Sequence, residues 1–329
     1  MFPPGGYLAV SFFFVLSGFS MTIGYRDRIL NTDFSYSNYI TKRLTKFYPL
    51  HWLVLFYIII RQSFAFIHQP YGVTKFVTNF LLLQSFVPLK DFYFSFNSPS
   101  WYLCNTLFYC FLFPFILRFI CKSNKKVRNT IPCVLITIYV LLVFLIPPKY
   151  HDAILYINPF VRIIDFILGI YTGLFFLNQI NTETQTKHNN RILLFVGIMC
   201  VVIVACCSFL QTYDCYIYIV KFYWIIFCPM ILVISLISYK KNGGGKTIIS
   251  RLLQLGGQYS FTFYMIHLVC IGLLGAICRK LNMEMWLTVI LSFMGTMMTS
   301  VICQKIFVNP IGIFLMTIIN KYGNNQNKY

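Results

Sequence analysis

Charged residues are scarce in this chain of 329 residues, and acidic residues are almost lacking. Asp, Glu, Lys and Arg together make up 11% of the chain, and only 8 residues are Asp or Glu. In a typical soluble domain about a quarter of the residues are charged. Hydrophobic residues instead make up 58% of this chain. The composition therefore excludes a water-soluble globular domain.

The shortage of acidic residues leaves a formal net charge of +19. Nucleic-acid-binding proteins gather such cations on one solvated face. Here the cations fall in short gaps between long apolar runs, so nucleic acid is not expected as a partner. The apolar runs are long enough to cross about 30 Å of hydrocarbon as helices, at about 1.5 Å per residue. We therefore predict an all-α fold, a polytopic bundle of transmembrane helices embedded in the lipid bilayer.

The 12 cysteines follow neither a metal-binding nor a redox pattern. The sequence contains no CxxC pair and no CxxC-to-His spacing, so we predict neither a disulfide scaffold nor a metal site. A cleavable signal peptide is not expected either. The residues after Met1 include no basic segment, and no small-residue cleavage site follows the first apolar run.

Nine apolar runs have the length of full membrane spans, and a tenth, at 75–89, is interpreted as a re-entrant or interfacial segment. The full spans are predicted at 7–25, 48–67, 101–117, 129–147, 160–178, 192–210, 217–238, 260–278 and 285–304. With the amino terminus outside, 19 of the 27 Lys and Arg residues face the cytoplasm and five face the exterior. This distribution agrees with the known excess of cations in cytoplasmic loops, and a full span at 75–89 would reverse it. The carboxyl terminus is therefore predicted to be cytoplasmic.

Five motifs, in order along the chain, resemble those of the acyltransferase-3 family of integral membrane acyltransferases. They correspond to the family patterns GVxxFFVLSGF, RxxRxxP, WxL, RxxxFxxG and SxxxYxxH, and they lie at Gly6–Phe19, Thr41–Leu50, Ser98–Leu103, Arg162–Gly169 and Gly257–His267. The matches extend over most of the chain, which makes the resemblance more specific than any one motif would be.

The resemblance implies ten helices in a bacterial cytoplasmic membrane and transfer of an acyl group, usually acetyl, from acyl-CoA. The acceptor would be a hydroxyl of a cell-surface carbohydrate or a similar molecule. We therefore expect a single acyltransferase domain over 1–329, with acyl-CoA as co-substrate and no bound cofactor. The family's catalytic histidine lies on a helix before the one that opens this chain, so that helix is expected ahead of Met1. The alternatives are a non-catalytic shortened member and a secondary transporter or flippase.

Arg43 and Lys46 are the candidates for binding the acyl donor. They lie three residues apart at a predicted cytoplasmic edge, so on a helix they share a face that could bind phosphates. The alternative is an orientation cluster whose side chains extend to lipid headgroups.

Polar residues inside the apolar runs are candidate pocket residues. Arg162 and Asp165 are spaced to neutralise each other on a helix, and they form either a structural pair or a wall that contacts a polar acceptor. His267 shares a helical stripe with Tyr264. Bare hydrocarbon offers an imidazole no partner, so His267 must find one within the protein. It is either a buried hydrogen-bonded histidine or the internal candidate for a catalytic base. Trp101 is either an interfacial anchor or a platform for stacking a sugar.

Ser17 completes the candidate pocket set. It precedes Gly18 on a predicted membrane helix, a pair more typical of close helix packing than of a nucleophile. His51 follows Tyr48 and Pro49 at a predicted inner membrane edge, where a solvated histidine is expected.

Reporter fusions test the predicted topology. Fusions after Lys126, Lys241 and Lys328 should report the cytoplasm, and fusions near Lys90 and His151 should report the exterior, because cations accumulate in cytoplasmic loops. Opposite signals beyond residue 100 would show that 75–89 is a full span.

Overall fold

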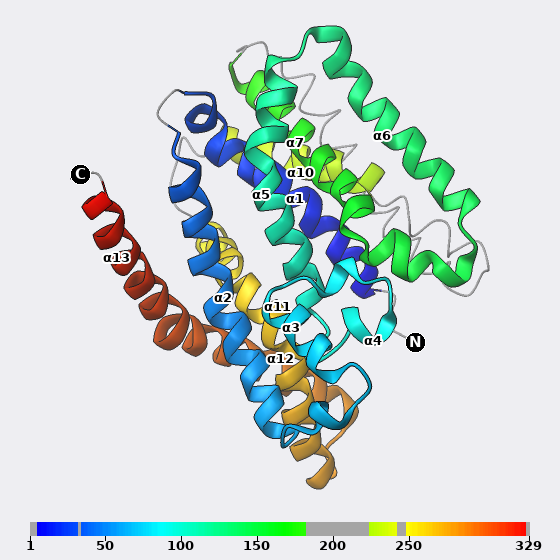
Figure 1. Cartoon of the computed structure of the whole chain (residues 1–329), viewed down its shortest axis with the longest axis vertical. Helices are drawn as coiled ribbons and strands as arrows, with labels where there is room; N and C mark the ends of the chain where they lie inside the picture. Colours follow the sequence, from blue (N-terminus) through cyan, green and yellow to red (C-terminus); the bar gives the residue numbers. More distant parts are fainter. Residues whose placement is uncertain (1–4, 32–33, 182–223, 242–247, 327–329) are drawn as a thin grey trace. The chain divides into compact units, whose positions relative to one another are not determined.

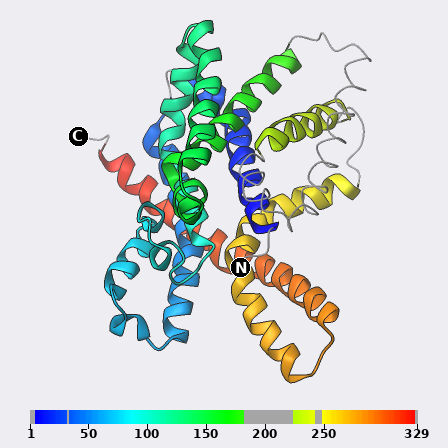
Figure 2. The ribbon, with the colours of Figure 1, turned by 90° about the vertical axis from the view of Figure 1, so that its right-hand side faces the viewer.

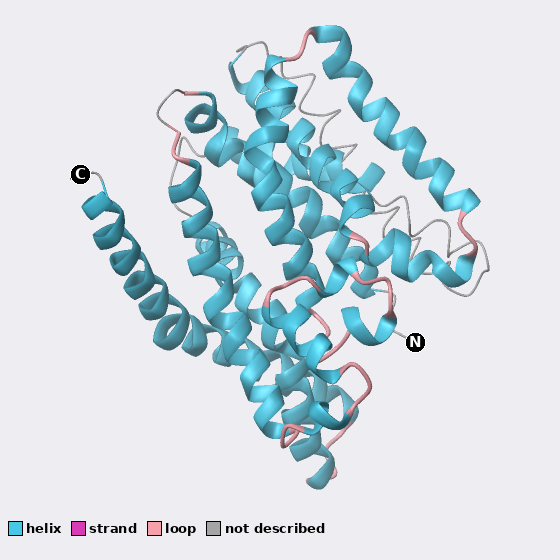
Figure 3. Cartoon of the chain, viewed as in Figure 1, coloured by secondary structure: helices cyan, strands magenta, loops and turns pink. Residues whose placement is uncertain are grey.

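The computed structural model describes residues 5–31, 34–181, 224–241 and 248–326. Within these ranges every regular element is a helix, which confirms the all-α prediction (Figure 3). In the described part of the chain, six helices are long and apolar enough to cross a membrane, and a shorter apolar helix covers Ile226–Leu236.

The predicted count of nine spans is not shown by these helices. The predicted run 192–210 lies outside the described residues, and 217–238 is described only from Trp224 onward. The run predicted at 48–67 instead belongs to α2 (Tyr36–Arg61). This helix starts twelve residues earlier than expected and includes the cations around Arg43, so its sequence is less apolar than that of a typical span.

The chain divides into two compact units that alternate along the sequence. Unit 1 comprises Met1–Phe34 and Phe108–Gly245, and unit 2 comprises Ser35–Leu107 and Lys246–Tyr329. Helix α5 (Ser100–Lys122) contributes its first turns to unit 2 and the rest to unit 1.

Unit 1 is a helical bundle that also contains the later part of α5. Its other helices are α1 (Gly5–Leu30), α6 (Lys125–Leu145), α7 (Pro159–Asn181) and α10 (Trp224–Lys241) (Figure 1). Helix α6 begins where Asn124 accepts a hydrogen bond from the Val127 amide at 2.9 Å, a standard amino-terminal cap. A 3-10 turn, η3 (Pro148–Tyr150), and a π-helical segment, η4 (Asp152–Ile157), connect α6 to α7.

Helices α1 and α7 cross at backbone contact because glycines lie on both facing surfaces. A Cβ atom added at Gly18 would overlap the Phe166 carbonyl, and one added at Gly169 would overlap the Val15 carbonyl. One turn further along α7, a Cβ at Gly173 would lie 2.8 Å from the Thr22 Cβ. Small residues allow this approach, and close van der Waals packing is what associates helices in a bilayer. The packing expected at the Ser17–Gly18 pair is therefore observed at Gly18.

The core of unit 1 surrounds this crossing. Buried side chains from α1, α6, α7 and α10 form one apolar cluster that includes Phe19, Tyr139 and Phe176. Aromatic rings meet edge to face within it, with ring centroids 5.6 Å apart for Phe19 and Phe176. Helix α5 joins the bundle through Tyr109, whose ring centroid lies 5.3 Å from that of Phe14.

Unit 2 is built around α2 and the pair formed by α11 (Ile248–Lys280) and α12 (Met285–Cys303). Helices α11 and α12 form a hairpin (Figure 2). A π-helical segment, η7 (Gln304–Val308), then leads into α13 (Asn309–Gln326). Helix α13 packs against α2, where a Cβ at Gly312 would lie 3.4 Å from the Thr45 carbonyl.

Helix α13 was not among the predicted spans, since the last span was expected to end at residue 304. The apolar pattern resumes directly after Lys305, with Ile306 and Phe307, so a single charge did not end the helical region. The continuous apolar helical stretch extends over Met285–Ile318.

The segment 75–89 contains no spanning helix, in agreement with its interpretation as a re-entrant or interfacial segment. Helix α3 (Gly72–Phe80) has nine residues, about 14 Å in length at the usual helical rise, which is half of what the hydrocarbon requires. Three short elements flank it, η1 (Ala65–His68), η2 (Gln84–Phe86) and α4 (Lys90–Tyr93).

Buried polar side chains hold this segment against the start of α5. Asn79 Nδ2 donates to Ser95 Oγ at 2.6 Å, and Gln84 Nε2 donates to Ser100 Oγ at 3.1 Å. Asn97 Nδ2 in turn donates to the Met265 carbonyl of α11 at 3.0 Å. Because buried polar groups are costly without partners, these bonds select one arrangement of an otherwise irregular segment.

Replacing Gly18 by Ala should destabilise the protein by about 1–3 kcal/mol, because the new methyl group meets the Phe166 backbone and forces α1 and α7 apart. The matched control is Gly24→Ala on the same helix, since a Cβ there meets nothing within 4 Å. That control should be neutral or slightly stabilising through helix propensity. Thermal unfolding in detergent measures the melting temperatures of both variants. Equal melting temperatures for Gly18→Ala and Gly24→Ala would contradict the close crossing.

Candidate functional site

A buried ion pair lies near the start of α7. Arg162 Nη1 lies 2.7 Å from Asp165 Oδ2, and the two side chains are 3% and 1% exposed. Arg162 Nη2 also donates to Ser11 Oγ on α1 at 2.9 Å. The guanidinium carbon lies 5.2 Å from the centroid of the Phe14 ring and 5.7 Å from that of Tyr156. Helix α1, helix α7 and η4 therefore surround one cation.

The physical requirement at this position is charge compensation. A single charge buried in a membrane domain costs several kcal/mol, whereas a neighbouring opposite charge removes much of that cost. Burial raises the pKa of the Tyr156 phenol in η4, so this side chain stays protonated and neutral beside the arginine. The carboxylate of Asp165 therefore balances the charge of Arg162. This geometry supports the structural interpretation of the pair, and contact with a polar acceptor stays a prediction.

His267 lies half-buried on α11, with Tyr264 one turn before it. Its Nδ1 atom is 2.6 Å from the Tyr264 carbonyl. A carbonyl oxygen only accepts hydrogen bonds, so Nδ1 carries the proton and Nε2 carries the lone pair of the neutral imidazole. The Phe263 ring stacks at 4° to the imidazole plane, and the Tyr264 ring meets Tyr102 at a centroid distance of 5.1 Å. An oriented imidazole with an acceptor nitrogen is what a general base requires.

Trp101 lies in the first turns of α5 and is covered by its surroundings. It is 3% exposed, and its carbonyl accepts a hydrogen bond from Ser85 Oγ at 2.9 Å. The ring is thus packed in the protein, and stacking of a sugar on it stays a prediction.

Arg43 and Lys46 lie on α2, as expected, on successive turns. The Arg43 guanidinium carbon lies 5.4 Å from the centroid of the Tyr39 ring, and Lys46 Nζ lies 5.9 Å from that of Phe47. Lys46 is exposed and Arg43 is partly buried. Both cations therefore cover aromatic rings of their own helix.

The predicted site residues belong to both units. Ser17, Arg162 and Asp165 belong to unit 1, and Arg43, Lys46, Trp101, Tyr264 and His267 belong to unit 2. The structure brings Arg162 together with Asp165, and Tyr264 together with His267.

His51 was expected to be solvated, and the structure corrects this. The side chain is 1% exposed, and its Nε2 donates to the Asn79 carbonyl at 2.8 Å. Its Nδ1 atom has no hydrogen-bond partner among the described residues. The helical spacing contained the signal, because His51 shares the buried face of α2 with Phe47 and Leu55.

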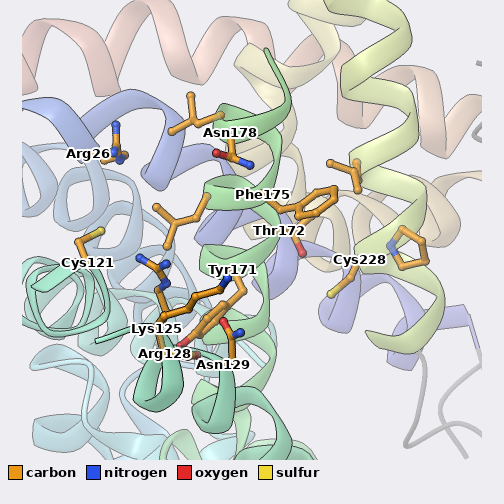
Figure 4. Close-up of a pocket in the computed structure, with 14 residues that line it drawn as sticks. Arg26, Cys121, Lys125, Arg128, Asn129, Tyr171, Thr172, Phe175, Asn178 and Cys228 are labelled. Carbon is orange, nitrogen blue, oxygen red and sulfur yellow. Dashed lines mark hydrogen bonds between the residues drawn. The ribbon is translucent and has the colours of Figure 1, made fainter. Parts of the chain in front are cut away.

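Sequence reasoning also missed a cavity in unit 1, here called the cationic cavity. It has a volume of about 870 Å³ and is lined by residues of α1, α5, α6, α7 and α10, including Arg26, Lys125 and Arg128 (Figure 4). Residues 26 and 125 are far apart in sequence, so no local pattern could place them in one cavity. Among the described residues, no cluster of His, Cys, Asp and Glu could hold a metal ion.

Comparison with protein families matches residues 2–305 to the acyltransferase-3 family, described as an acyltransferase domain. Among curated proteins, the chain is similar to the acyltransferase MdmB of Streptomyces mycarofaciens. The two are 39% identical over 122 residues, which is 36% of this chain and 30% of the relative. The match thus spans less than a third of the relative's length. No solved structure matches the chain.

The buried pair predicts a specific pattern of stability. Either Arg162→Met or Asp165→Leu alone should cost about 3–5 kcal/mol, because each leaves one buried charge without its partner. The double variant should recover most of that loss, since an apolar pair avoids the cost of burying charge. Melting temperatures in detergent measure all three variants. A double variant as unstable as the two single losses combined would contradict the pairing.

Proposed function

Because the chain belongs to the acyltransferase-3 family, we propose that it transfers an acyl group, acetyl in the first instance, from acyl-CoA to a hydroxyl of a cell-surface carbohydrate or a similar acceptor. The family match over residues 2–305 is the observation that carries this proposal. As a family member, the chain is classed as an acyltransferase for groups other than aminoacyl groups. The match runs through both units, so we take 1–329 as one functional domain.

The proposed setting is a bacterial cytoplasmic membrane, with the carboxyl terminus in the cytoplasm. Six described helices have the length and composition of spans. Together with α2, α10 and the apolar run 192–210, they give the nine spans inferred from the distribution of cations. This assignment is supported by the 26 residues of α2, which measure about 39 Å at the usual rise and exceed the thickness of the hydrocarbon.

The reaction needs a base, a bound donor and a bound acceptor. A base removes the proton of the acceptor hydroxyl, and the oxygen attacks the thioester carbonyl. The tetrahedral intermediate then collapses, the carbon–sulfur bond breaks, and the CoA thiolate leaves and is protonated. Such general-base assistance contributes about 10²–10⁴-fold. His267 is the internal candidate for the base, supported by an Nε2 that carries the lone pair when Nδ1 donates to Tyr264.

The remaining candidates would hold the substrates. We assign Arg43 and Lys46 to the phosphates of the donor, because charge-assisted hydrogen bonds to phosphate are among the strongest that proteins make. Within unit 2, we assign Trp101 and Tyr264 to the acceptor. Contact of the Arg162–Asp165 pair of unit 1 with an acceptor is a separate assignment. Acceptor assignment for the Arg162–Asp165 pair requires that the apolar double variant stays folded and still loses acyl transfer.

An assay with radiolabelled acetyl-CoA and a panel of oligosaccharide acceptors tests the function. The protein in lipid nanodiscs should transfer the labelled acetyl group from acetyl-CoA to an acceptor. His267→Gln should lower kcat by about 10²-fold or more, as expected for loss of a base. The Arg43→Gln/Lys46→Gln double variant should raise the KM for acetyl-CoA more than it lowers kcat, because it removes binding contacts.

Two variants serve as controls. His68→Gln changes an exposed histidine, and Lys42→Gln removes an exposed cation from α2; both should leave the kinetics unchanged. Absence of transfer with every acyl-CoA and acceptor would favour a non-catalytic family member. Transfer that persists unchanged in His267→Gln would remove His267 as the base.

A further inference from the structure

The cationic cavity has the size and composition of a small-molecule site. Its volume of about 870 Å³ lies within the range of about 300–1,000 Å³ typical of ligand pockets. All of its 14 lining residues belong to unit 1. Figure 4 shows the cations from α1 and α6 on one side of α7, and Phe175 and Cys228 on the side facing α10.

The charged side chains that line the cavity are all positive. Arg26, Lys125 and Arg128 line it, and none of the described residues that line it is acidic. Arg26 forms an ion pair with Asp27 at 2.9 Å, but the aspartate side chain is 83% exposed and points into solvent. Such a surface pair contributes little, and an arginine keeps further N–H donors for a ligand. The cavity therefore favours a ligand with concentrated negative charge.

The apolar part of the lining comes mainly from α7 and α10. Leucines of α7 and α10 line the cavity together with Phe175 and Pro229. A site with cations on one side and hydrocarbon walls on the other suits an amphipathic anion, with its charge on the cations and its apolar part between α7 and α10. Phosphate, like carboxylate, is an anionic group that guanidinium binds through paired hydrogen bonds, and phosphate carries more negative charge.

Hydrogen bonds between helices fix the backbone segments that carry the cations. The Tyr171 hydroxyl on α7 donates to the Arg128 carbonyl at 2.8 Å, which fixes the first turns of α6. Arg118 Nε on α5 donates to the Ile29 carbonyl at 3.0 Å, which fixes the end of α1 near Arg26. A site whose walls are already fixed loses less entropy on binding.

Orientation of the protein in the membrane does not explain this arrangement. Lys122 and Lys126 belong to the same α5–α6 connection and would serve orientation equally well, yet neither lines the cavity. Lys125 and Arg128 alone among the cations of that connection do so.

We propose that the cationic cavity binds the phosphate groups of an amphipathic phosphorylated ligand, namely the nucleotide end of acyl-CoA. The identification of this ligand rests on the proposed function, and an anionic phospholipid is the other source of the same chemistry. CoA carries a diphosphate and a separate 3′-phosphate, and these are the groups that the cations of the cavity would bind.

Direct binding of CoA and of 3′,5′-ADP tests the proposal. The full chain is placed in phosphatidylcholine nanodiscs, and dissociation constants are measured by calorimetry. Lys125→Gln/Arg128→Gln should weaken binding of both probes by about tenfold or more, the loss expected for one charge-assisted hydrogen bond. Lys122→Gln/Lys126→Gln removes the same charge from the same connection outside the cavity, and should change affinity by less than about twofold. Size-exclusion profiles check that both variants are folded.

Three results would overturn the proposal. Equal weakening in both double variants would mean diffuse attraction rather than a site. Unchanged affinity in the cavity variant would remove the acyl donor as ligand. Selective loss of phosphatidylglycerol around the cavity variant in mixed nanodiscs, with CoA affinity unchanged, would assign the cavity to a lipid headgroup.

Because CoA carries no acyl group, this binding is independent of catalysis. Cavity-dependent CoA binding by a protein that transfers no acyl group would leave the site standing and overturn the proposed function. Full acyl transfer by a protein whose CoA affinity is the same with and without the cavity cations would confirm the proposed function and overturn the site.

Discussion

The backbone contact between α1 and α7 is the constraint on which unit 1 depends. Helices in a bilayer gain no hydrophobic free energy by associating, so they rely on close packing of small residues. Gly18 and Gly169 permit that packing by lying opposite backbone carbonyls. Toward the start of the helices, the crossing sets Ser11 beside Arg162. Toward their ends, Arg26 and the later turns of α7 line one cavity.

In both units, the buried polar groups described above are paired with another polar group. In unit 1, Arg162 forms an ion pair with Asp165, three residues away, and donates a hydrogen bond to the hydroxyl of Ser11 on α1. In unit 2 the irregular segment between α2 and α5 has its amides bonded to serines, as in Asn79 to Ser95. Each group has a partner that apolar surroundings would not supply. Polar residues in such a domain therefore mark either fixed structure or a site for a ligand.

The sequence predicted those features that depend on local pattern. Apolar runs located the helices because the length needed to cross hydrocarbon is fixed. The Arg162–Asp165 pairing followed from spacing on one helix. The charge distribution indicated that 75–89 is no full span, and the nine-residue α3 agrees with this. These inferences needed no knowledge of which helices are neighbours.

Features that depend on neighbouring helices escaped the sequence analysis. The cationic cavity combines Arg26 with Lys125 from a distant helix, and no periodicity links them. His51 was misplaced because its position along the span was considered and its buried face was not. Helix α13 was missed because Lys305 was taken as the end of the apolar region, although its long side chain can extend away from hydrocarbon.

An electron cryomicroscopy structure of the full chain in nanodiscs with CoA tests this account most directly. The account predicts backbone contact between α1 and α7 at Gly18 and Gly169, with nucleotide phosphates at hydrogen-bond distance from Arg26, Lys125 and Arg128. Side chains separating the two helices at Gly18, or a nucleotide bound with none of these cations in contact, would contradict it.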